Sequence, residues 1–225
     1  MLFRVFLILL FVTGCGRPLT DAESAFLQSI HGDALDQSRL RLVDGALVGD
    51  VTFERKPRPR VTCRERIVPP VKREIVTVSP AGVTIFNRVY LAEDWYLDDY
   101  VPDFPDRINL SAAMLLAHEA THVWQWQNRK LTKYHPLKAA AEHSAEDPYL
   151  FDPDDTRNFL EFGYEQQGAI VEEYVCCRAL DPTAPRTERL HNLLAAVMPV
   201  SDLPKRRTSD VWIPWKDAKI EGICT

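Results

Sequence analysis

The chain has 225 residues, of which 46% are hydrophobic and 26% are charged, and its formal net charge is −5. This length allows one domain with a substantial core, and the composition is that of a globular protein. Because the net charge is negative and no basic stripe is visible, nucleic-acid binding is excluded as the main function.

Residues 1–14 have the pattern of a secretory signal peptide: Arg4, then an apolar run from Val5 to Val12, then small residues. The run is shorter than the ~20 apolar residues of a membrane-spanning helix. Cys15 ends the stretch "VTGC", which resembles the bacterial lipobox, in which the cysteine becomes the lipidated first residue. We therefore expect a lipoprotein of the bacterial envelope, anchored through Cys15 on the periplasmic face. Gly16 after the cysteine favours the outer membrane.

A helix and several short strands are predicted for the first part of the mature chain. Thr20 or Asp21 can cap a helix that Gly32 ends. Residues 38–45 and 47–54 are predicted strands, and residues 73–91 are predicted to form a strand, a turn at 80–82 and a second strand. Between them lies a basic, proline-broken stretch, residues 55–63, which is either a solvated loop or a contact for anionic lipid head groups.

Helices dominate the rest of the chain. The first begins at Asn109 or Ser111 and ends near residue 129; the second covers residues 158–180, with Asp154 or Asp155 as its cap. The intervening segment, residues 130–157, is long enough to be functional or partly helical. A shorter helix, 186–198, and an irregular tail follow. We predict an α+β fold with a small sheet, in one domain that covers residues 15–225.

Four further cysteines form an even set in a chain expected to reach an oxidising compartment, so disulfides are expected. Cys176 and Cys177 are adjacent and rarely bond to each other, because their side chains diverge. One of them is expected to pair with Cys63 and the other with Cys224, in either order. A cysteine-ligated metal is the rival interpretation, but no C-x-x-C spacing supports it.

The stretch "LLAHEATHVWQWQ" carries the H-E-x-x-H pattern. On a helix, His118 and His122 lie one turn apart on one face, so both can bind one ion at ~2.0–2.1 Å. Glu119 is rotated by ~100° and can contact a water on that ion, as a metallopeptidase requires. The alternative is a half-buried helix that carries two polar histidines. The apolar neighbours favour zinc, because buried histidines need partners.

A third ligand is expected from the second helix, where Glu161, Glu165 and Glu172 share one face with Gly168. A glycine there lets two helices approach closely. Glu165 is the first candidate; Glu172 is the second, or an acceptor from a histidine N–H; Glu161 is the third. The rival interpretation is a solvated acidic face. Five residues are candidates for stabilising an oxyanion: Tyr134, His135, His143, Tyr149 and Tyr164.

The remaining histidines and two of the tryptophans have ordinary structural explanations. His31 and His191 are predicted to be surface or cap residues. Trp124 and Trp126 are predicted to pack the H-E-x-x-H helix against the core.

Two stretches, "HEATHVWQWQ" and "FGYEQQGAIVEEY", resemble the zincin-type metallopeptidase domain of extracellular contractile injection systems and Vgr-related proteins. The stretches "RPLTDAESAFLQSIHGDALDQSRLRLV" and "GVTIFNRVYLAEDWY" extend the resemblance over most of the mature chain. It implies that His118, His122 and Glu165 bind zinc and that Glu119 is the general base. The chain departs from the family at Ala120, where leucine is usual, and at Gly168, where alanine is usual.

The sequence thus predicts a zinc metallopeptidase that acts on a peptide or protein, with secretion-system components as possible partners. Two rivals remain. One is a catalytically silent zinc lipoprotein with a structural or docking role, for which Glu119 would be dispensable. The other is a metal-free envelope scaffold held by disulfides. The substrate is not predicted.

Overall fold

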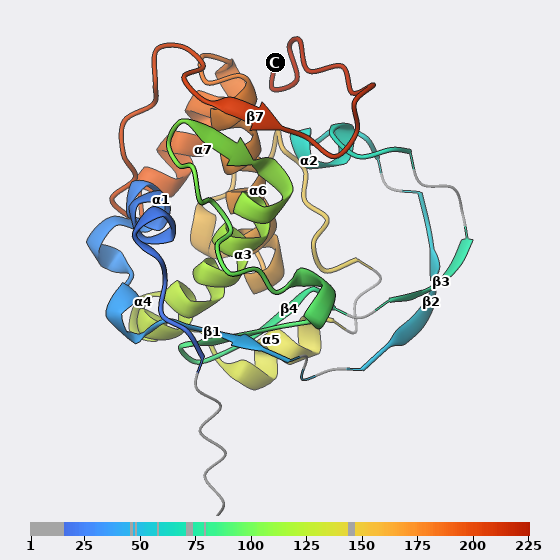
Figure 1. Ribbon diagram of the computed structural model, residues 1–225, viewed down its shortest axis with the longest axis vertical. Helices are drawn as coiled ribbons and strands as arrows, with labels where there is room; N and C mark the ends of the chain where they lie inside the picture. The colour runs from blue at the N-terminus through green and yellow to red at the C-terminus, as the bar shows by residue number, and fades with distance from the viewer. Residues whose placement is uncertain are drawn as a thin grey trace, which may run out of the picture.

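Two long helices, α3 (Leu110–Gln127) and α6 (Tyr164–Leu180), lie against each other at the centre of the molecule (Figure 1). The computed structural model describes residues 16–225 except 46, 48, 58, 71–73, 79 and 144–146. The predicted signal peptide and Cys15 lie outside the described residues. The other helices are α1 (Asp21–His31), α2 (Cys63–Arg66), α4 (Arg129–Thr132), α5 (Pro136–Glu142) and α7 (Pro185–Ala195).

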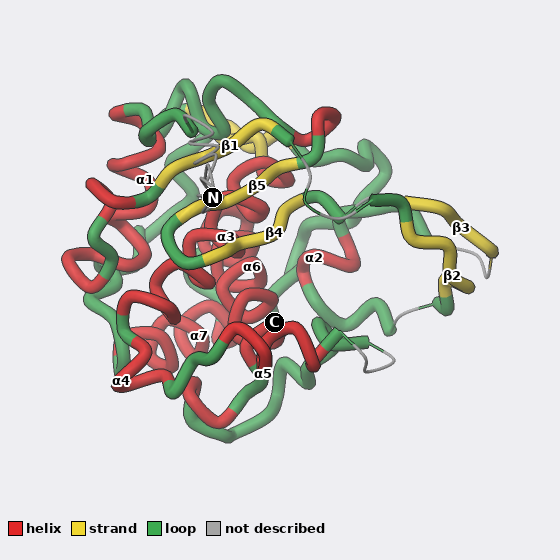
Figure 2. Tube along the Cα trace, turned by 90° about the horizontal axis from the view of Figure 1, so that it is seen from below, coloured by secondary structure: helices red, strands yellow, loops and turns green. Residues whose placement is uncertain are grey.

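Short strands form three small sheets. β1 (Arg41–Asp44), β5 (Arg88–Leu91) and β4 (Gly82–Ile85) make the first, in that order, with β1 and β5 parallel. This sheet lies across one side of α3, and β4 is an edge strand (Figure 2). β2 (Val51–Arg55) and β3 (Glu74–Val78) form an antiparallel pair that extends from the body, and α2 lies between them in the chain. β6 (Arg107–Asn109) pairs with β7 (Asp210–Trp212) in parallel.

The predicted caps account for the ends of the first helices. Thr20 caps α1 in a capping box with Glu23, and Gly32 ends it with φ +50°. Asn109 caps α3 by accepting from the N–H of Ala112. α3 is buried on nearly every face, as its apolar sequence predicts.

One continuous core surrounds α3 and α6, and it extends from α1 to Cys224 near the end of the chain. Trp124 is fully buried there, with its ring centroid 6.1 Å from that of Phe159. Trp126 is half-buried and lies 4.4 Å, ring to ring, from Phe86. The prediction that both tryptophans pack against the core is confirmed for Trp124, whereas Trp126 packs against a separate small cluster that contains Tyr134 and Tyr164. The helix-dominated α+β class is confirmed.

Two predicted boundaries were wrong. Residues 82–91 are a hairpin, β4 and β5, because Phe86 takes a left-handed conformation (φ 59°) and reverses the chain. The second long helix does not begin at residue 158: a 3₁₀ turn, Phe159–Glu161, precedes extended backbone at Phe162 and Gly163, and α6 begins only at Tyr164.

Both expected disulfides are present, and their pairing is Cys63–Cys176 and Cys177–Cys224. The first joins α2 to α6, and the second joins α6 to the C-terminal tail. Since all four sulfurs are bonded in pairs, they are not available as metal ligands.

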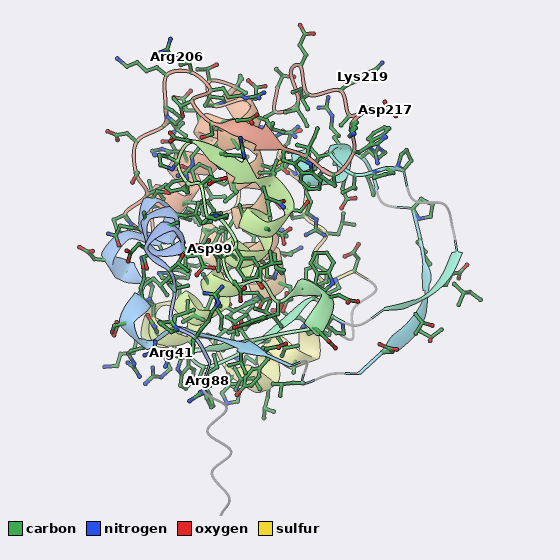
Figure 3. The ribbon with its side chains drawn as sticks, in the orientation of Figure 1. Arg41, Arg88, Asp99, Arg206, Asp217 and Lys219 are labelled. Atoms are coloured by element: carbon green, nitrogen blue, oxygen red, sulfur yellow. A yellow bond between two sulfur atoms is a disulfide. The ribbon has the colours of Figure 1, made fainter. Side chains whose placement is uncertain are left out.

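Charged side chains are spread over opposite ends of the molecule. Arg41 and Arg88, which are register partners in β1 and β5, lie at one end, and Arg206, Asp217 and Lys219 lie at the other (Figure 3). Within the described part of the chain, no helix combines the length and apolar character needed to cross a membrane.

Candidate metal centre

His118 and His122 lie one turn apart on α3 and face Glu165 in the first turn of α6. The two Nε2 atoms are 3.0 Å apart, and each lies 3.3 Å from Oε2 of Glu165. A tetrahedral ion with bonds of about 2.0–2.1 Å separates its ligand atoms by ~3.3 Å. The three donor atoms therefore already have the spacing of zinc ligands, and all three side chains are buried.

The other nitrogen of each histidine also has a polar neighbour. Nδ1 of His122 donates to Oε1 of Gln125 at 2.9 Å, and the Gln125 amide is itself oriented because its nitrogen donates to Tyr164 O and Gln167 Oε1. Nδ1 of His118 lies 3.0 Å from Oε1 of Glu172, an ion-pair distance without the alignment of a good hydrogen bond. With a proton on Nδ1, each histidine presents the lone pair of Nε2 to the centre.

Glu172 is joined in turn to Arg64 of α2, whose Nη1 donates to Glu172 Oε2. Burial raises the pKa of Glu172, but the charges of Arg64 and His118 outweigh it and hold the pKa at about 2. A chain of contacts thus runs from Arg64 through Glu172 to His118.

The carboxylates make the centre attractive to cations. Burial lowers the pKa of His118, but the charge of Glu172 and the hydrogen bond to Glu165 outweigh it and raise the pKa to about 10. Burial likewise raises the pKa of Glu165, whereas His122, His118 and His143 together hold it well below its usual range. A cation is stabilised here, whether it is a proton or a metal ion, and the donor set of two imidazoles and one carboxylate suits Zn²⁺.

Glu119 lies beside the three donors without joining them. Its Oε2 accepts a hydrogen bond of 2.6 Å from Thr84 Oγ1 on β4. A Cβ atom at Gly82 would lie 2.7 Å from Oε1 of Glu119, so a glycine at this point of the edge strand leaves room for the carboxylate. The position agrees with the predicted rotation of Glu119 away from the ligand face, and its charge still acts on His122.

No protein-family model matches the chain. The type VI secretion system spike protein VgrG2b of Pseudomonas aeruginosa is 24% identical over 160 residues, which are 71% of this chain but 13% of VgrG2b. The solved effector domain of P. aeruginosa VgrG2b has a TM-score of 0.50 at 22% identity, over 83% of this chain and 88% of the domain. The chain is thus similar to a part of a Vgr protein. At this identity, the structural match shows a shared fold.

Gly168 is where α6 passes closest to the first histidine. A Cβ atom there would lie 2.6 Å from Cε1 of His118 and 2.8 Å from both ring nitrogens. The sequence-based expectation of a close approach at this glycine fits this geometry. The alanine that is usual here in the resembling family would not fit without a shift of the ring or the helix.

We therefore expect Gly168→Ala to weaken zinc binding about tenfold, because overpacking of about 1–3 kcal/mol would displace His118. Competition with a chromophoric chelator measures this affinity. Gly49→Ala is the matched control, since a Cβ at Gly49 has no neighbour within 4 Å. Wild-type affinity in Gly168→Ala would show that the ring position does not depend on this contact.

Of the five oxyanion candidates, the structure brings two to the centre. His143 Nε2 lies 3.1 Å from Oε1 of Glu165, and the Tyr149 ring lies 5.9 Å from that of His118. The other three are occupied elsewhere: Tyr134 and Tyr164 pack against each other at 4.9 Å, and His135 caps α5. The Tyr164 hydroxyl donates to the carbonyl of Lys133.

Segment 130–157 is partly helical, and its helix α5 is joined to the start of α6. Glu142, the last residue of α5, accepts hydrogen bonds of 3.0 Å from the backbone N–H groups of Tyr164 and Glu165. The cap of α6 is therefore supplied by a side chain 22 residues away, and the third donor lies in the turn that this cap fixes.

Two predicted positions differ from the structure. His31 was expected to be a surface or cap residue. It ends α1, but its side chain makes no cap hydrogen bond and is fully buried, with Nε2 3.1 Å from Thr121 Oγ1 on α3, and burial lowers its pKa to about 4. Glu161 lies outside α6, because the chain breaks at Phe162 and Gly163; its carboxylate accepts from Asn158 at the surface. Glu165 and Glu172, seven residues apart on α6, both face His118.

Three contributors were missed by the sequence analysis: Arg64, Thr84 and Gln125. Gln125 had a usable signal, because it lies three residues after His122 and therefore on the same side of α3. Arg64 and Thr84 come from segments more than 30 residues before the motif, and no local pattern connects them with it.

Proposed function

We propose that the protein is a zinc-dependent peptidase with a zincin-like fold. The observation that carries the proposal is the triangle formed by His118 Nε2, His122 Nε2 and Glu165 Oε2, with atoms 3.0–3.3 Å apart and the carboxylate of Glu119 beside it. Three protein donors leave a fourth position for water or substrate, which is the arrangement of a catalytic rather than a structural zinc site.

His118, His122 and Glu165 would hold the ion. Bound there, the ion would supply Lewis-acid chemistry, which lowers the pKa of water to about 7 and polarises a carbonyl. Glu119 takes the proton from the attacking water and delivers it to the leaving amine, while Thr84 holds one carboxylate oxygen so that the other remains available. We assign the stabilisation of the developing oxyanion to His143 or Tyr149, because His143 Nε2 lies 3.1 Å from Glu165 Oε1 and the Tyr149 ring lies 5.9 Å from that of His118.

The comparisons favour a role connected with secretion. The similar structure is described as an effector domain, and the similar curated protein as a type VI secretion system spike protein. We extend this to the present chain as a secretion-associated effector that meets a peptide or protein substrate. Its proposed place of action is the periplasmic face of the envelope, where a lipid anchor at Cys15 would hold it.

A catalytically silent zinc protein is the second candidate. The observation that favours it is the depth of the site, because both histidines and Glu165 are no more than 6% exposed, as ligands of structural zinc commonly are. The position of Glu119 separates the candidates, since a purely structural ion makes no use of a carboxylate held beside its ligands.

Zinc analysis and a peptide-library assay test the proposal. We expect about one equivalent of zinc in the purified protein, and cleavage of library peptides that a chelator stops and added Zn²⁺ restores. Zinc binding without cleavage across a broad library would favour the silent candidate. Protein that takes up no zinc would exclude both.

A further inference from the structure

The short helix α2 is fastened to the same part of α6 that contacts the metal centre. Cys63 is bonded to Cys176, and the backbone N–H groups of Cys63 and Arg64 donate to the Glu173 carboxylate at 2.9 and 3.3 Å. α2 has only four residues, which is too few to hold a helix by itself. The place of Arg64 therefore depends on these attachments to α6.

Arg64 lies between this attachment and the zinc ligands. Its guanidinium pairs with Oε2 of Glu172, and Oε1 of Glu172 lies 3.0 Å from Nδ1 of His118. Glu165, Glu172 and Cys176 are spaced i, i+7 and i+11 on α6, so the third ligand, the carboxylate and the disulfide share one face. The disulfide is thus one turn beyond the carboxylate that orients a ligand.

We infer that α2 is an oxidation-dependent brace of the metal centre: the Cys63–Cys176 disulfide holds Arg64 as a positioning residue, and Arg64 fixes Glu172 against His118. This inference rests on the proposed zinc site. Without the disulfide, α2 loses its covalent attachment, Glu172 loses its cation, and the His118 ring loses a fixed neighbour on Nδ1. Removing such an outer partner typically weakens metal binding about 10–100-fold.

The chemistry of the brace is thiol–disulfide exchange with a disulfide-bearing oxidant. The two thiols lose two protons and two electrons as the S–S bond forms, and the oxidant takes them up as its own disulfide opens to two thiols. A reducing compartment keeps the cysteines as thiols. The zinc site would accordingly reach full affinity only in an oxidising compartment. In the cytosol the protein would bind zinc more weakly, and less of it would carry the ion.

The Cys177–Cys224 disulfide provides the comparison, because it also starts from α6 but joins the C-terminal tail, which contacts α2 through Arg66 and not through Arg64. The test compares zinc affinity, by chelator competition, in Cys63→Ser/Cys176→Ser and Cys177→Ser/Cys224→Ser. We expect at least tenfold weaker binding in the first variant and a change within twofold in the second. Equal losses in both variants, or wild-type affinity in the first, would overturn the brace.

Arg64 variants keep the test decisive if the disulfide variant does not fold. Arg64→Ala, with both disulfides intact, should also bind zinc about tenfold more weakly and alter the visible spectrum of the Co²⁺-substituted protein; Arg64→Lys should recover part of the loss. If Arg64 acts through Glu172, then adding Arg64→Ala to Glu172→Gln should cause no further loss. Additive losses, or wild-type affinity in Arg64→Ala, would overturn the inference.

Zinc affinity as the readout separates this inference from the proposed function. A wild-type protein that binds zinc through His118 but cleaves no peptide would leave the brace supported and the peptidase rejected. A wild-type protein that binds no zinc would overturn both. Zinc bound equally with and without the Cys63–Cys176 disulfide would overturn the brace alone.

Discussion

Replacing Glu119 by glutamine is expected to lower kcat/KM for a cleavable library peptide by about 10²–10⁴-fold while the protein keeps its zinc. Glutamine has nearly the same shape and can still accept from Thr84, so the local packing is preserved. It cannot take a proton from water, which is the role that we assign to Glu119. Initial rates with a fluorogenic peptide, together with the zinc content, measure both parts of the prediction.

Glu161→Gln is the matched control for this experiment, because Glu161 is an exposed glutamate outside the donor triangle, and its carboxylate accepts from Asn158 in its own turn. It should cleave the peptide at the wild-type rate. Full activity in Glu119→Gln would mean that another group accepts the proton, and the general base would have to be sought elsewhere. Equal losses in both variants would point to an effect on folding.

Zinc is also expected to stabilise the folded protein strongly. At a free zinc concentration about a thousand times Kd, binding adds about 4 kcal/mol to the free energy of unfolding. For a domain of this size, each kcal/mol raises Tm by about 2–4 °C, so we expect a shift of about 8–16 °C between chelated and zinc-loaded protein. Differential scanning calorimetry with and without EDTA measures the shift.

His122→Ala should abolish that shift, because it removes one corner of the donor triangle and the donor to Oε1 of Gln125. His191→Ala is the matched histidine control, since His191 is on α7 and its ring contacts Tyr174 instead of the centre. A shift of wild-type size in His122→Ala would show that zinc binds at another site.

The parts of the centre that follow from helix geometry were predictable. The 3.6-residue period alone places His118 and His122 on one face, and Gly168 identified the part of α6 that α3 approaches. Glu165 was predicted as the third ligand because it lies on the same face of α6 as Gly168. The same reasoning placed Glu161 there too, and it was wrong because backbone conformation at Phe162 and Gly163, which the apolar pattern does not encode, ends the periodicity.

The parts that depend on distant segments could not be predicted. Arg64 precedes Glu172 by 108 residues, and Thr84 precedes Glu119 by 35 residues, so only the folded chain brings them together. The disulfide pairing was open for the same reason: adjacent cysteines on α6 point to different neighbours, α2 and the tail, and this depends on the rotation of the helix. Likewise, the burial of His31 depends on Thr121, 90 residues away.

The cap that Glu142 gives to α6 links the binding of zinc to the docking of α5 on the body of the protein. The residues that α5 holds in place are the first turn of α6 and, through it, the third ligand. The docking of α5 and the binding of zinc are therefore coupled. If docked α5 raises the affinity for zinc by some factor, bound zinc must raise the equilibrium constant for α5 docking by the same factor. A molecule that bound to docked α5 would raise the affinity of the centre for zinc without contacting the ion. Zinc would raise the affinity of the protein for that molecule by the same factor.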